Sequence, residues 1–442
     1  MSSPRIVAVT GGSGQLGTHV LRRLLADPAI DQVISIDRRP PIIGSPKLKA
    51  VTGDVCDGAF ARHLQGVDAL VHCAFIISGG ERSPVFRAVN VEGSKNVFRA
   101  AASAGVKTVT FVSSVSAYGC VPGHPVPIVE STPRVRQEEF AYACCKYDVE
   151  AYLDEVELQY PDIAVNRIRA NILVGRRMPH LLGLVMRIGW IPDFGGHPFP
   201  IVWDEDVADL LVLAVKQGAR GAYNAGADEL LPSAELAART GATAVQTSRI
   251  MQLIHTGLYE LSSRLNLNWF SDPSWATRAL ATLIMSSERA KRELGWTPRH
   301  PTAVSVVERF REVSPWRLDV WLLLVLWMLS RATRSAASPL AGRSGRMFLC
   351  LNGPVAGDFS LLVENGTLRV RAGAPSLSTS TVTMTATLFR DLLAGRASLD
   401  DAFASGKIDW FGPESDRELF RKIVGLPAGR HGGAWRLAAR LR

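Results

Sequence analysis

A glycine-rich turn near the amino terminus constrains this chain of 442 residues more than any other segment. The sequence VAVTGGSGQLG, residues 7–17, places Gly11, Gly14 and Gly17 three residues apart, between an apolar β-branched run and an amphipathic segment. This order predicts a strand, a tight turn and a helix whose amino-terminal amides attract an anion. Asp37 follows about twenty residues later, at the end of the next predicted strand. The combination indicates a dinucleotide-binding βαβ unit.

The segment from Arg5 to about Lys146 predicts the fold around this turn. Apolar strand-like runs alternate with helical patterns, as is typical of parallel strands buried on both faces. We therefore expect an α/β fold with a Rossmann-type, doubly wound parallel sheet. Cofactor contacts are expected from the glycine turn and from the ends of the second, third and fourth strands. The candidate cofactor-binding residues are Gly11, Ser13, Gly14, Gln15, Leu16, Gly17, Asp37, Arg38, Asp54, Val55 and Ala74.

Tyr142 and Lys146 are candidate catalytic residues because they lie four residues apart in the helix predicted after the fifth strand. This spacing places the phenol and the ammonium on one helix face, one turn apart. A nearby cation lowers the pKa of a phenol, which then exchanges a proton with a substrate hydroxyl or carbonyl. The hydroxyl of Ser114 can orient the same oxygen. Such a pair also arises by chance, but its position after the glycine turn and the two strand ends favours a catalytic role.

Several motifs resemble, in order, those of the extended short-chain dehydrogenase/reductases, the NAD-dependent epimerase/dehydratase superfamily. They are TGGSGQLG, VHCAF, NVEGS, VSSVSAYG and YACCK, with Gln15 standing where an aromatic residue is usual. The resemblance implies that Tyr142 is the general acid/base and that Lys146 lowers its pKa and binds the cofactor ribose. It also implies that Ser114 polarises the reacting oxygen and that Asn90 belongs to the supporting hydrogen-bond network. No metal site is expected.

The residues after the second strand bear on the choice of cofactor. Asp37 can accept hydrogen bonds from both ribose hydroxyls of NAD and repels the 2′-phosphate of NADP. Arg38 and Arg39 follow directly, and a guanidinium there can instead hold that phosphate. NAD is therefore the expected cofactor, with NADP as the alternative.

The predicted substrate lobe, mainly 172–200 and 228–290, favours an apolar substrate. Where sugar-nucleotide enzymes of the resembled family carry a phosphate-binding arginine, this chain has Phe199. A diphosphate without a cationic partner is costly in a site of low dielectric. We therefore expect an oxidoreductase for a hydroxyl or ketone of a sterol-like or lipid substrate. The nearby Arg176 and Arg177 keep a nucleotide-sugar epimerase or dehydratase open as an alternative.

A catalytically silent protein that only binds cofactor or lipid is a further alternative. The presence of the complete set of Ser114, Tyr142 and Lys146 argues against it. The family resemblance implies a homodimer, formed through the helices predicted at 87–104 and 139–157. Six cysteines without a CxxC pair, and a start that enters a core strand at once, predict a reduced, cytoplasmic protein.

The pattern changes to hairpins after residue 345. Asn365 and Gly366 lie between two apolar runs and form a strong two-residue hairpin signal. DFSLLVENGTLRV, TMTATLFRDLLAG and LDDAFASGKIDWFG resemble the sterol carrier protein type 2 family, which implies a separate α+β lipid-binding domain over 345–426. The candidate lining residues, each of which can equally be core, are Phe389, Leu392, Leu393, Phe403 and Trp410.

A predicted apolar helix and basic linker at 313–344 separates this domain from the dehydrogenase-like domain at 1–312. Ten consecutive apolar residues at 320–329 are too few to span a bilayer. The segment either docks the two domains or, over 316–334, lies on a membrane surface. The basic tail at 427–442 and the net charge of +9 are compatible with a solvated surface or with anionic lipid. No nucleic-acid module accompanies the charge, so nucleic acid is not an expected partner.

Overall fold

The computed structural model divides the chain into two compact units. The first comprises Met1–Pro41 and Pro46–Arg311, and the second comprises Ile42–Ser45 and Glu312–Arg442. The structure describes residues 5–77, 83–178, 180–193, 196–246, 249–264, 283–314, 317–318, 333, 340–353, 355–373 and 378–425. The apolar run at 320–329 and the tail at 427–442 lie outside these ranges, so the predictions for them stay predictions.

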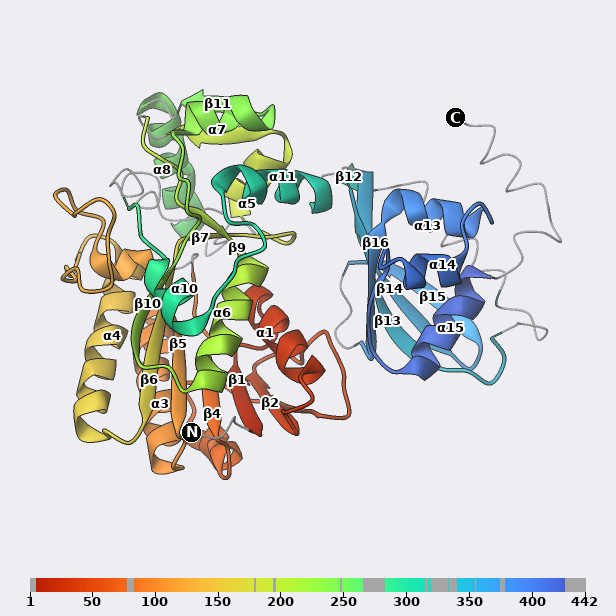
Figure 1. Cartoon of the computed structure of the whole chain (residues 1–442), viewed down its shortest axis with the longest axis horizontal. Coiled ribbons are helices and arrows are strands. Elements are labelled where there is room, and N and C mark those ends of the chain that lie inside the picture. Colours follow the sequence, from red (N-terminus) through yellow and green to blue (C-terminus); the bar gives the residue numbers. More distant parts are fainter. Residues whose placement is uncertain are drawn as a thin grey trace. The chain divides into compact units, whose positions relative to one another are not determined.

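The first unit is built on a seven-stranded parallel sheet, which confirms the predicted fold (Figure 1). Its strand order is β10-β6-β5-β4-β1-β2-β3. The strands are β1 (Ile6–Thr10), β2 (Gln32–Asp37), β3 (Leu48–Thr52), β4 (Ala69–His72), β5 (Thr108–Ser114), β6 (Ala164–Ala170) and β10 (Gly221–Ala225). The order reverses between β1 and β4, and ligands of such sheets bind at the carboxyl ends of the strands beside this point.

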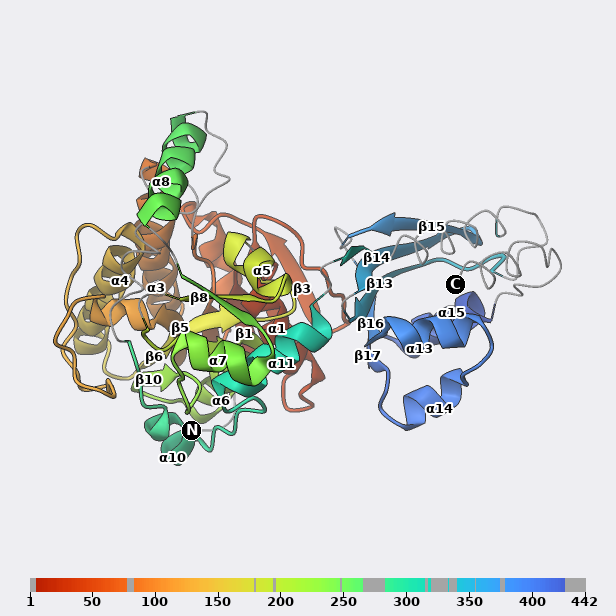
Figure 2. The same ribbon diagram turned by 90° about the horizontal axis from the view of Figure 1, so that it is seen from above.

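Helices cover both faces of the sheet (Figures 1 and 2). Helices α3 (Ser94–Ser103) and α4 (Ala141–Gln159) pack on one face, and α1 (Gln15–Ala26) and α6 (Asp204–Gln217) pack on the other. Apolar residues recur along α1 with helical periodicity, and each buried leucine contributes about 1.5–3 kcal/mol. The buried apolar residues of α1 are Leu16, Val20, Leu21, Leu24 and Leu25.

The predicted helix at 87–104 is interrupted at its start. A short helix α2 (Pro84–Arg87) leads into the π-turn η2 (Ala88–Gly93), and regular α-helix begins only with α3. Single π-turns of this kind are frequent at functional sites. Here the turn carries Asn90, which is completely buried.

The substrate lobe consists of short strands and helices inserted after β6. Strand β7 (Ile172–Val174) pairs with β9 (Ile201–Trp203), and β8 (Trp190–Asp193) pairs with β11 (Thr243–Gln246). Its helices are α5 (His180–Arg187), α7 (Ser233–Thr240) and α8 (Arg249–Arg264), and α11 (Ala303–Val313) follows later in the chain. Helix α10 (Glu288–Leu294) instead packs against α6 and β10 of the sheet core. Part of the expected lobe, residues 265–282, lies outside the described residues.

The second unit is a separate domain with a mixed sheet. The sheet order is β12-β14-β13-β16-β17, with β15 paired to β14. The strands are β12 (Arg317–Leu318), β13 (Gly345–Asn352), β14 (Val355–Glu364), β15 (Thr367–Ala372), β16 (Ser380–Thr385) and β17 (Asp409–Phe411). Asn365 and Gly366 both have positive φ and close the predicted hairpin between β14 and β15.

Three helices complete this domain: α13 (Ala386–Leu393), α14 (Leu399–Ala404) and α15 (Glu414–Val424). Of the candidate lining residues, Phe389, Leu392 and Leu393 are buried in its apolar core, and Phe403 and Trp410 pack against that core. They therefore stabilise the domain, and lipid binding by it stays a prediction. Within the described parts of the chain, no helix is long and apolar enough to cross a membrane.

Candidate active site

The glycine turn is shaped by close backbone contacts that exclude side chains. Gly11 has a φ of +73°, and a Cβ there would lie 2.5 Å from the backbone nitrogen of Ala74. A Cβ on Gly17 would lie 2.1 Å from the carbonyl oxygen of Gly11. The turn is therefore packed between α1 and the loop after β4, and its backbone faces the carboxyl edge of the sheet.

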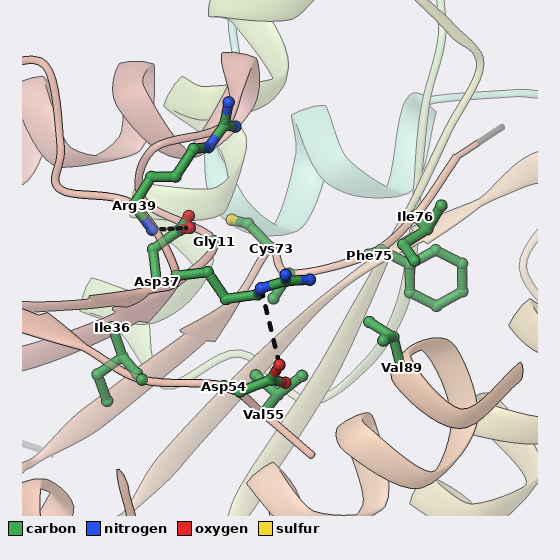
Figure 3. A pocket seen from close by; sticks show the side chains of 14 residues that line it. Gly11, Ile36, Asp37, Arg39, Asp54, Val55, Cys73, Phe75, Ile76 and Val89 are labelled. Atoms are coloured by element: carbon green, nitrogen blue, oxygen red, sulfur yellow. Dashed lines mark hydrogen bonds and ion pairs between the residues drawn. The ribbon is translucent and has the colours of Figure 1, made fainter. Parts of the chain in front are cut away.

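A cavity of about 520 Å³ lies at the carboxyl ends of β1 to β4 (Figure 3). The structure brings several predicted cofactor-binding residues together on its wall: Gly11, Gly14, Asp37, Arg38, Asp54, Val55 and Ala74. Their roles in binding stay predictions. Phe75, Ile76 and Val89 also line the cavity, and the sequence reasoning did not select them. Phe75 ends the VHCAF motif, whereas Ile76 and Val89 lie just outside the motifs. The motifs do not show which of these side chains face the cavity.

The acidic residues of the cavity are held by local backbone groups. Asp37 accepts a hydrogen bond from the amide of Ser13 at 3.0 Å. It accepts another from the amide of Arg39 at 3.1 Å (Figure 3). Asp54 accepts one from the amide of Cys56 at 2.9 Å. The Nε of Arg38 lies 3.7 Å from Oδ2 of Asp54. Asp37 is thus fixed beside the glycine turn, and Arg38 forms an ion pair across the cavity mouth.

Three further residues of the turn, Ser13, Gln15 and Leu16, were also predicted to bind the cofactor. The hydroxyl of Ser13 donates to the carbonyl of Arg39 at 2.6 Å. The amide of Gln15 donates to Asp204, the first residue of α6, at 2.6 Å. Leu16 is buried on α1. Gln15 therefore ties the turn to α6, a contact between residues far apart in the sequence.

Tyr142, Lys146 and Ser114 lie at the next strand end of the sheet, and all three are buried. Burial raises the pKa of Tyr142 to about 12, against the lowering effect of its hydrogen bond with Ser114. Burial also lowers the pKa of Lys146 to about 7, although the Glu150 carboxylate opposes this change. The expected lowering of the Tyr142 pKa is therefore wrong for this structure, because burial of the phenol outweighs the Ser114 hydrogen bond.

Aromatic rings enclose the Lys146 ammonium. Its Nζ lies 3.4 Å from the ring centroid of Phe75, 4.6 Å from that of Phe111 and 5.6 Å from that of Tyr142. The same nitrogen donates a hydrogen bond to the carbonyl of Val112 at 2.7 Å. Sequence spacing predicted the Tyr142–Lys146 pair but not this enclosure, since Phe75 comes from a different βα connection.

Asn90 supports the loop after β4. Its side chain accepts a hydrogen bond from the amide of Ile76 at 2.7 Å and donates one to the carbonyl of the same residue at 2.9 Å. Its own carbonyl accepts from the hydroxyl of Ser94, which also contacts His72. Asn90 thus fixes the backbone of this loop, and its role in the catalytic hydrogen-bond network stays a prediction.

Two residues mark the substrate side. Phe199 is 1% exposed, so its ring packs inside the lobe. Its side chain carries no polar group for a ligand. Asn171 follows β6 at the carboxyl edge of the sheet and is also buried. Within the described residues its side-chain amide has no hydrogen-bond partner, so a polar group is available at this edge.

Comparison with known proteins relates the first unit to a family. Residues 7–226 match the NAD dependent epimerase/dehydratase family. The chain is 26% identical over 339 residues to Uncharacterized protein Rv0501 of Mycobacterium tuberculosis, covering 72% of this chain and 88% of that one. It is 38% identical over 119 residues to a 3-beta-hydroxysteroid dehydrogenase of Mycolicibacterium neoaurum, covering 25% of this chain and 32% of that one.

A solved structure with the same fold is that of a DesIV double mutant, a dTDP-glucose 4,6-dehydratase of Streptomyces venezuelae with NAD and DAU bound. It matches with a TM-score of 0.51 and 25% identity, covering 69% of this chain and 95% of that chain. The Rossmann-type core, the glycine turn and the order of the motifs therefore agree with an NAD-dependent epimerase/dehydratase domain.

Proposed function

Because residues 7–226 form a domain of the NAD dependent epimerase/dehydratase family, we propose that the chain is an NAD-dependent oxidoreductase for an apolar substrate. It would interconvert a hydroxyl and a ketone on a sterol-like or lipid molecule. The observation that carries the proposal is the meeting of Ser114, Tyr142 and Lys146 at a strand end of the parallel sheet. The dinucleotide cavity lies at the carboxyl ends of the neighbouring strands.

The residues of the cavity fit NAD. Gly11 lacks the Cβ that would obstruct a pyrophosphate, and the amino terminus of α1 faces the same place. Asp37 is held in position to accept hydrogen bonds from ribose hydroxyls. NAD is also the cofactor named in the similar DesIV structure. When bound, it supplies or accepts the hydride.

Tyr142 is the proton-exchanging group in this proposal. In the oxidative direction, hydride leaves the carbinol carbon and the hydroxyl proton passes to the phenolate oxygen of Tyr142. In the reductive direction the phenol returns that proton to the substrate oxygen. Ser114 orients the reacting oxygens, and the positive charge of Lys146 stabilises the phenolate. Because all three groups are shielded from water, their interactions are stronger than at an exposed site.

The apolar character of the substrate lobe supports the substrate class. The buried Phe199 offers no charge to a diphosphate. The 3-beta-hydroxysteroid dehydrogenase among the relatives acts, as its name states, on a steroid. We also propose that the second unit binds lipid and raises the substrate concentration near the first by covalent tethering.

The test is to mix the purified chain with NAD or NADP and, separately, a 3β-hydroxysteroid, a long-chain alcohol or a UDP-hexose. We expect formation of reduced cofactor with the steroid or the alcohol, and a loss of about 100-fold or more in Tyr142→Phe. Tyr147→Phe, on the same helix, is the matched control and should retain activity. Conversion of the UDP-hexose, with no turnover of the steroid or the alcohol, would show that the substrate is a nucleotide sugar.

A further inference from the structure

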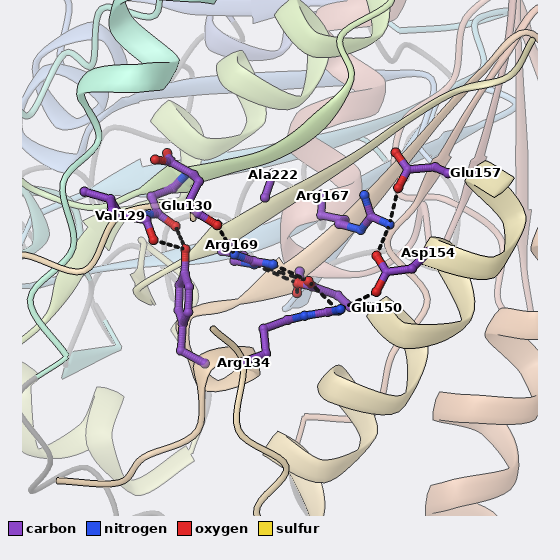
Figure 4. A network of polar contacts seen from close by, with 12 residues as sticks. Val129, Glu130, Arg134, Glu150, Asp154, Glu157, Arg167, Arg169 and Ala222 are labelled. Atoms are coloured by element: carbon purple, nitrogen blue, oxygen red, sulfur yellow. Dashed lines mark hydrogen bonds and ion pairs between the residues drawn. The ribbon is translucent and has the colours of Figure 1, made fainter. Parts of the chain in front are cut away.

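A buried carboxylate on the catalytic helix gathers polar groups from three other segments. Glu150 of α4 is completely buried. It accepts hydrogen bonds from Arg169 on β6 at 2.6–3.2 Å and from Ser113 on β5 at 2.5 Å. Arg134, on the loop before α4, donates a further one at 3.1 Å (Figure 4). With three side chains hydrogen-bonded to it, the Glu150 carboxylate has one fixed position.

The same helix face carries the proposed catalytic pair. Tyr142, Lys146 and Glu150 are spaced four residues apart and therefore lie on successive turns of one face of α4. Each is tied to β5. Tyr142 is hydrogen-bonded to Ser114, Lys146 donates to the carbonyl of Val112, and Glu150 accepts from Ser113. Three consecutive residues of β5 thus hold three successive turns of α4.

Arg169 fixes Glu150 from the opposite side. Its Nη1 donates to the carbonyl of Glu130 at 3.2 Å, and its guanidinium carbon lies 4.5 Å from the ring centroid of Tyr118. The Tyr118 hydroxyl in turn donates to the side chain of Asn224 on β10 at 2.8 Å. The network therefore joins α4 to β5, β6 and β10 at their carboxyl ends, beside the proposed reacting atoms.

A second arginine on β6 shows the same type of contact without the link to β5. Arg167 is buried and pairs with Asp154 and Glu157 of α4 at 2.8 Å each (Figure 4). Asp154 lies about three helical turns beyond Tyr142. Asp154 also pairs with Arg134, so Arg167 meets the Glu150 network only through that arginine. Arg167 thus also joins β6 to α4, but it lies farther along the helix from Tyr142 than Glu150 does.

We propose that Glu150 is a positioning residue, which fixes α4 against β5 and so holds Tyr142 within reach of Ser114. The proposal rests on the proposed function, in which Tyr142 exchanges the proton. A carboxylate that is held by three side chains resists the small displacements to which such chemistry is sensitive. A shift of about 1 Å at a reacting group can cost about 100-fold in rate.

The experiment compares Glu150→Gln, Ser113→Ala and the control Arg167→Gln. Each variant is measured for kcat, for KM of cofactor and substrate, and for melting temperature. We expect kcat to fall about 100-fold in Glu150→Gln and about 10-fold in Ser113→Ala, with both KM values within about twofold. Arg167→Gln should lose thermal stability while kcat stays within about twofold of the wild type.

Two results would overturn the proposal. One is an equal loss of kcat in Arg167→Gln, which would mean that any broken ion pair on β6 has this effect. The other is an unchanged kcat in Ser113→Ala and Glu150→Gln. Glu150→Gln removes the carboxylate that pairs with the buried Arg169 and can prevent folding, but Ser113→Ala keeps this pair, so the test still decides.

A readout without substrate separates this proposal from the proposed function. The phenolate absorbance of Tyr142 is titrated as the difference between each protein and the same protein carrying Tyr142→Phe. If Glu150 holds Tyr142 at Ser114, its loss removes the Ser114 hydrogen bond that lowers the pKa of the phenol, so the phenol should ionise at a higher pH. Another titratable group that acts on the Tyr142 phenol is Cys145.

The same shift in Ser113→Ala, and none in Arg167→Gln, would support the positioning role even if the wild type turned over no steroid or alcohol. In that case only the proposed substrate class would fail. Absence of the shift in both Glu150→Gln and Ser113→Ala would overturn the positioning role itself.

Discussion

The two ends of the proposed site differ in their contact with water. At the cofactor end, the side chains of Arg38 and Asp54 are 72% and 40% exposed, and their ion pair spans 3.7 Å. At the catalytic end, Lys146 is 2% exposed and Glu150 is completely buried. Because water screens the exposed ion pair, it contributes only about 0–1 kcal/mol to the free energy of unfolding. For the buried charges, the largest electrostatic effect is the cost of removing them from water. Charge substitutions should therefore have large effects at one end and small effects at the other.

The largest effect is expected from removal of the buried cation. Lys146→Met should lower kcat by about 100-fold to 10,000-fold, because the Tyr142 phenolate loses its stabilising charge. Lys95→Met is the matched control, since its ammonium also lies over a ring, that of Tyr152 on α4, at 5.6 Å. Steady-state rates of the two variants test the difference. A similar loss in both would mean that the burial of Lys146 has no special role.

Burial of Lys146 also predicts a pH dependence of stability. Its pKa is lowered from 10.5 to about 7 in the folded state, so between these values the unfolded chain binds more protons. The contribution of Lys146 to the free energy of unfolding therefore rises as the pH rises from about 7 to about 10.5, and it is smallest below pH 7. At about 1.4 kcal/mol per pKa unit, the change is roughly 3–5 kcal/mol.

Denaturant unfolding of wild type and Lys146→Met at pH 7 and at pH 9.5 measures this contribution. The stability difference, wild type minus variant, should increase at the higher pH. A constant difference would indicate that Lys146 keeps its ordinary pKa in the folded protein.

The sequence predicted the parts of the site that depend on local backbone chemistry. The glycine turn and the position of Asp37 follow from residues that are close in the chain, and so does the hairpin at Asn365 and Gly366. The Tyr142–Lys146 pair follows from helical spacing alone. Such features need no knowledge of how distant segments pack.

The parts that could not be predicted depend on register between distant segments. Phe75 encloses Lys146 because the loop after β4 meets α4, and Glu150 meets Arg169 because of how α4 lies on β6. The direction of the Tyr142 pKa change was mispredicted for the same reason, since a sequence pattern does not show how deeply a phenol is buried. No sequence motif shows which distant side chains cover a given phenol or ammonium group.

An intermediate effect is expected at the backbone of the cofactor end. Gly17→Ala places a Cβ against the carbonyl of Gly11, so the turn must move. We expect a loss of about 1–3 kcal/mol in stability together with weaker NADH binding. Gly58→Ala is the control, because a Cβ there meets no atom within 4 Å. Thermal melts and NADH fluorescence distinguish the two, and a neutral Gly17→Ala would contradict the tight packing of the turn.

The smallest effect is expected from the exposed ion pair itself. Asp54→Asn removes the carboxylate that pairs with Arg38, so the guanidinium becomes free to bind a 2′-phosphate. NADPH should then bind about 2–5-fold more tightly relative to NADH, because an exposed ion pair contributes less than about 1 kcal/mol. The added substitution Arg38→Ala should remove this gain, and the gain should shrink at high salt. Asp57→Asn, whose carboxylate caps the helix η1 (Gly58–Leu64), controls for the loss of one negative charge near the site. Fluorescence titration with both reduced cofactors gives the ratio. A change of 100-fold or more would contradict the contrast between the two ends, because it would show that a charge in contact with water governs binding as strongly as a buried one governs catalysis.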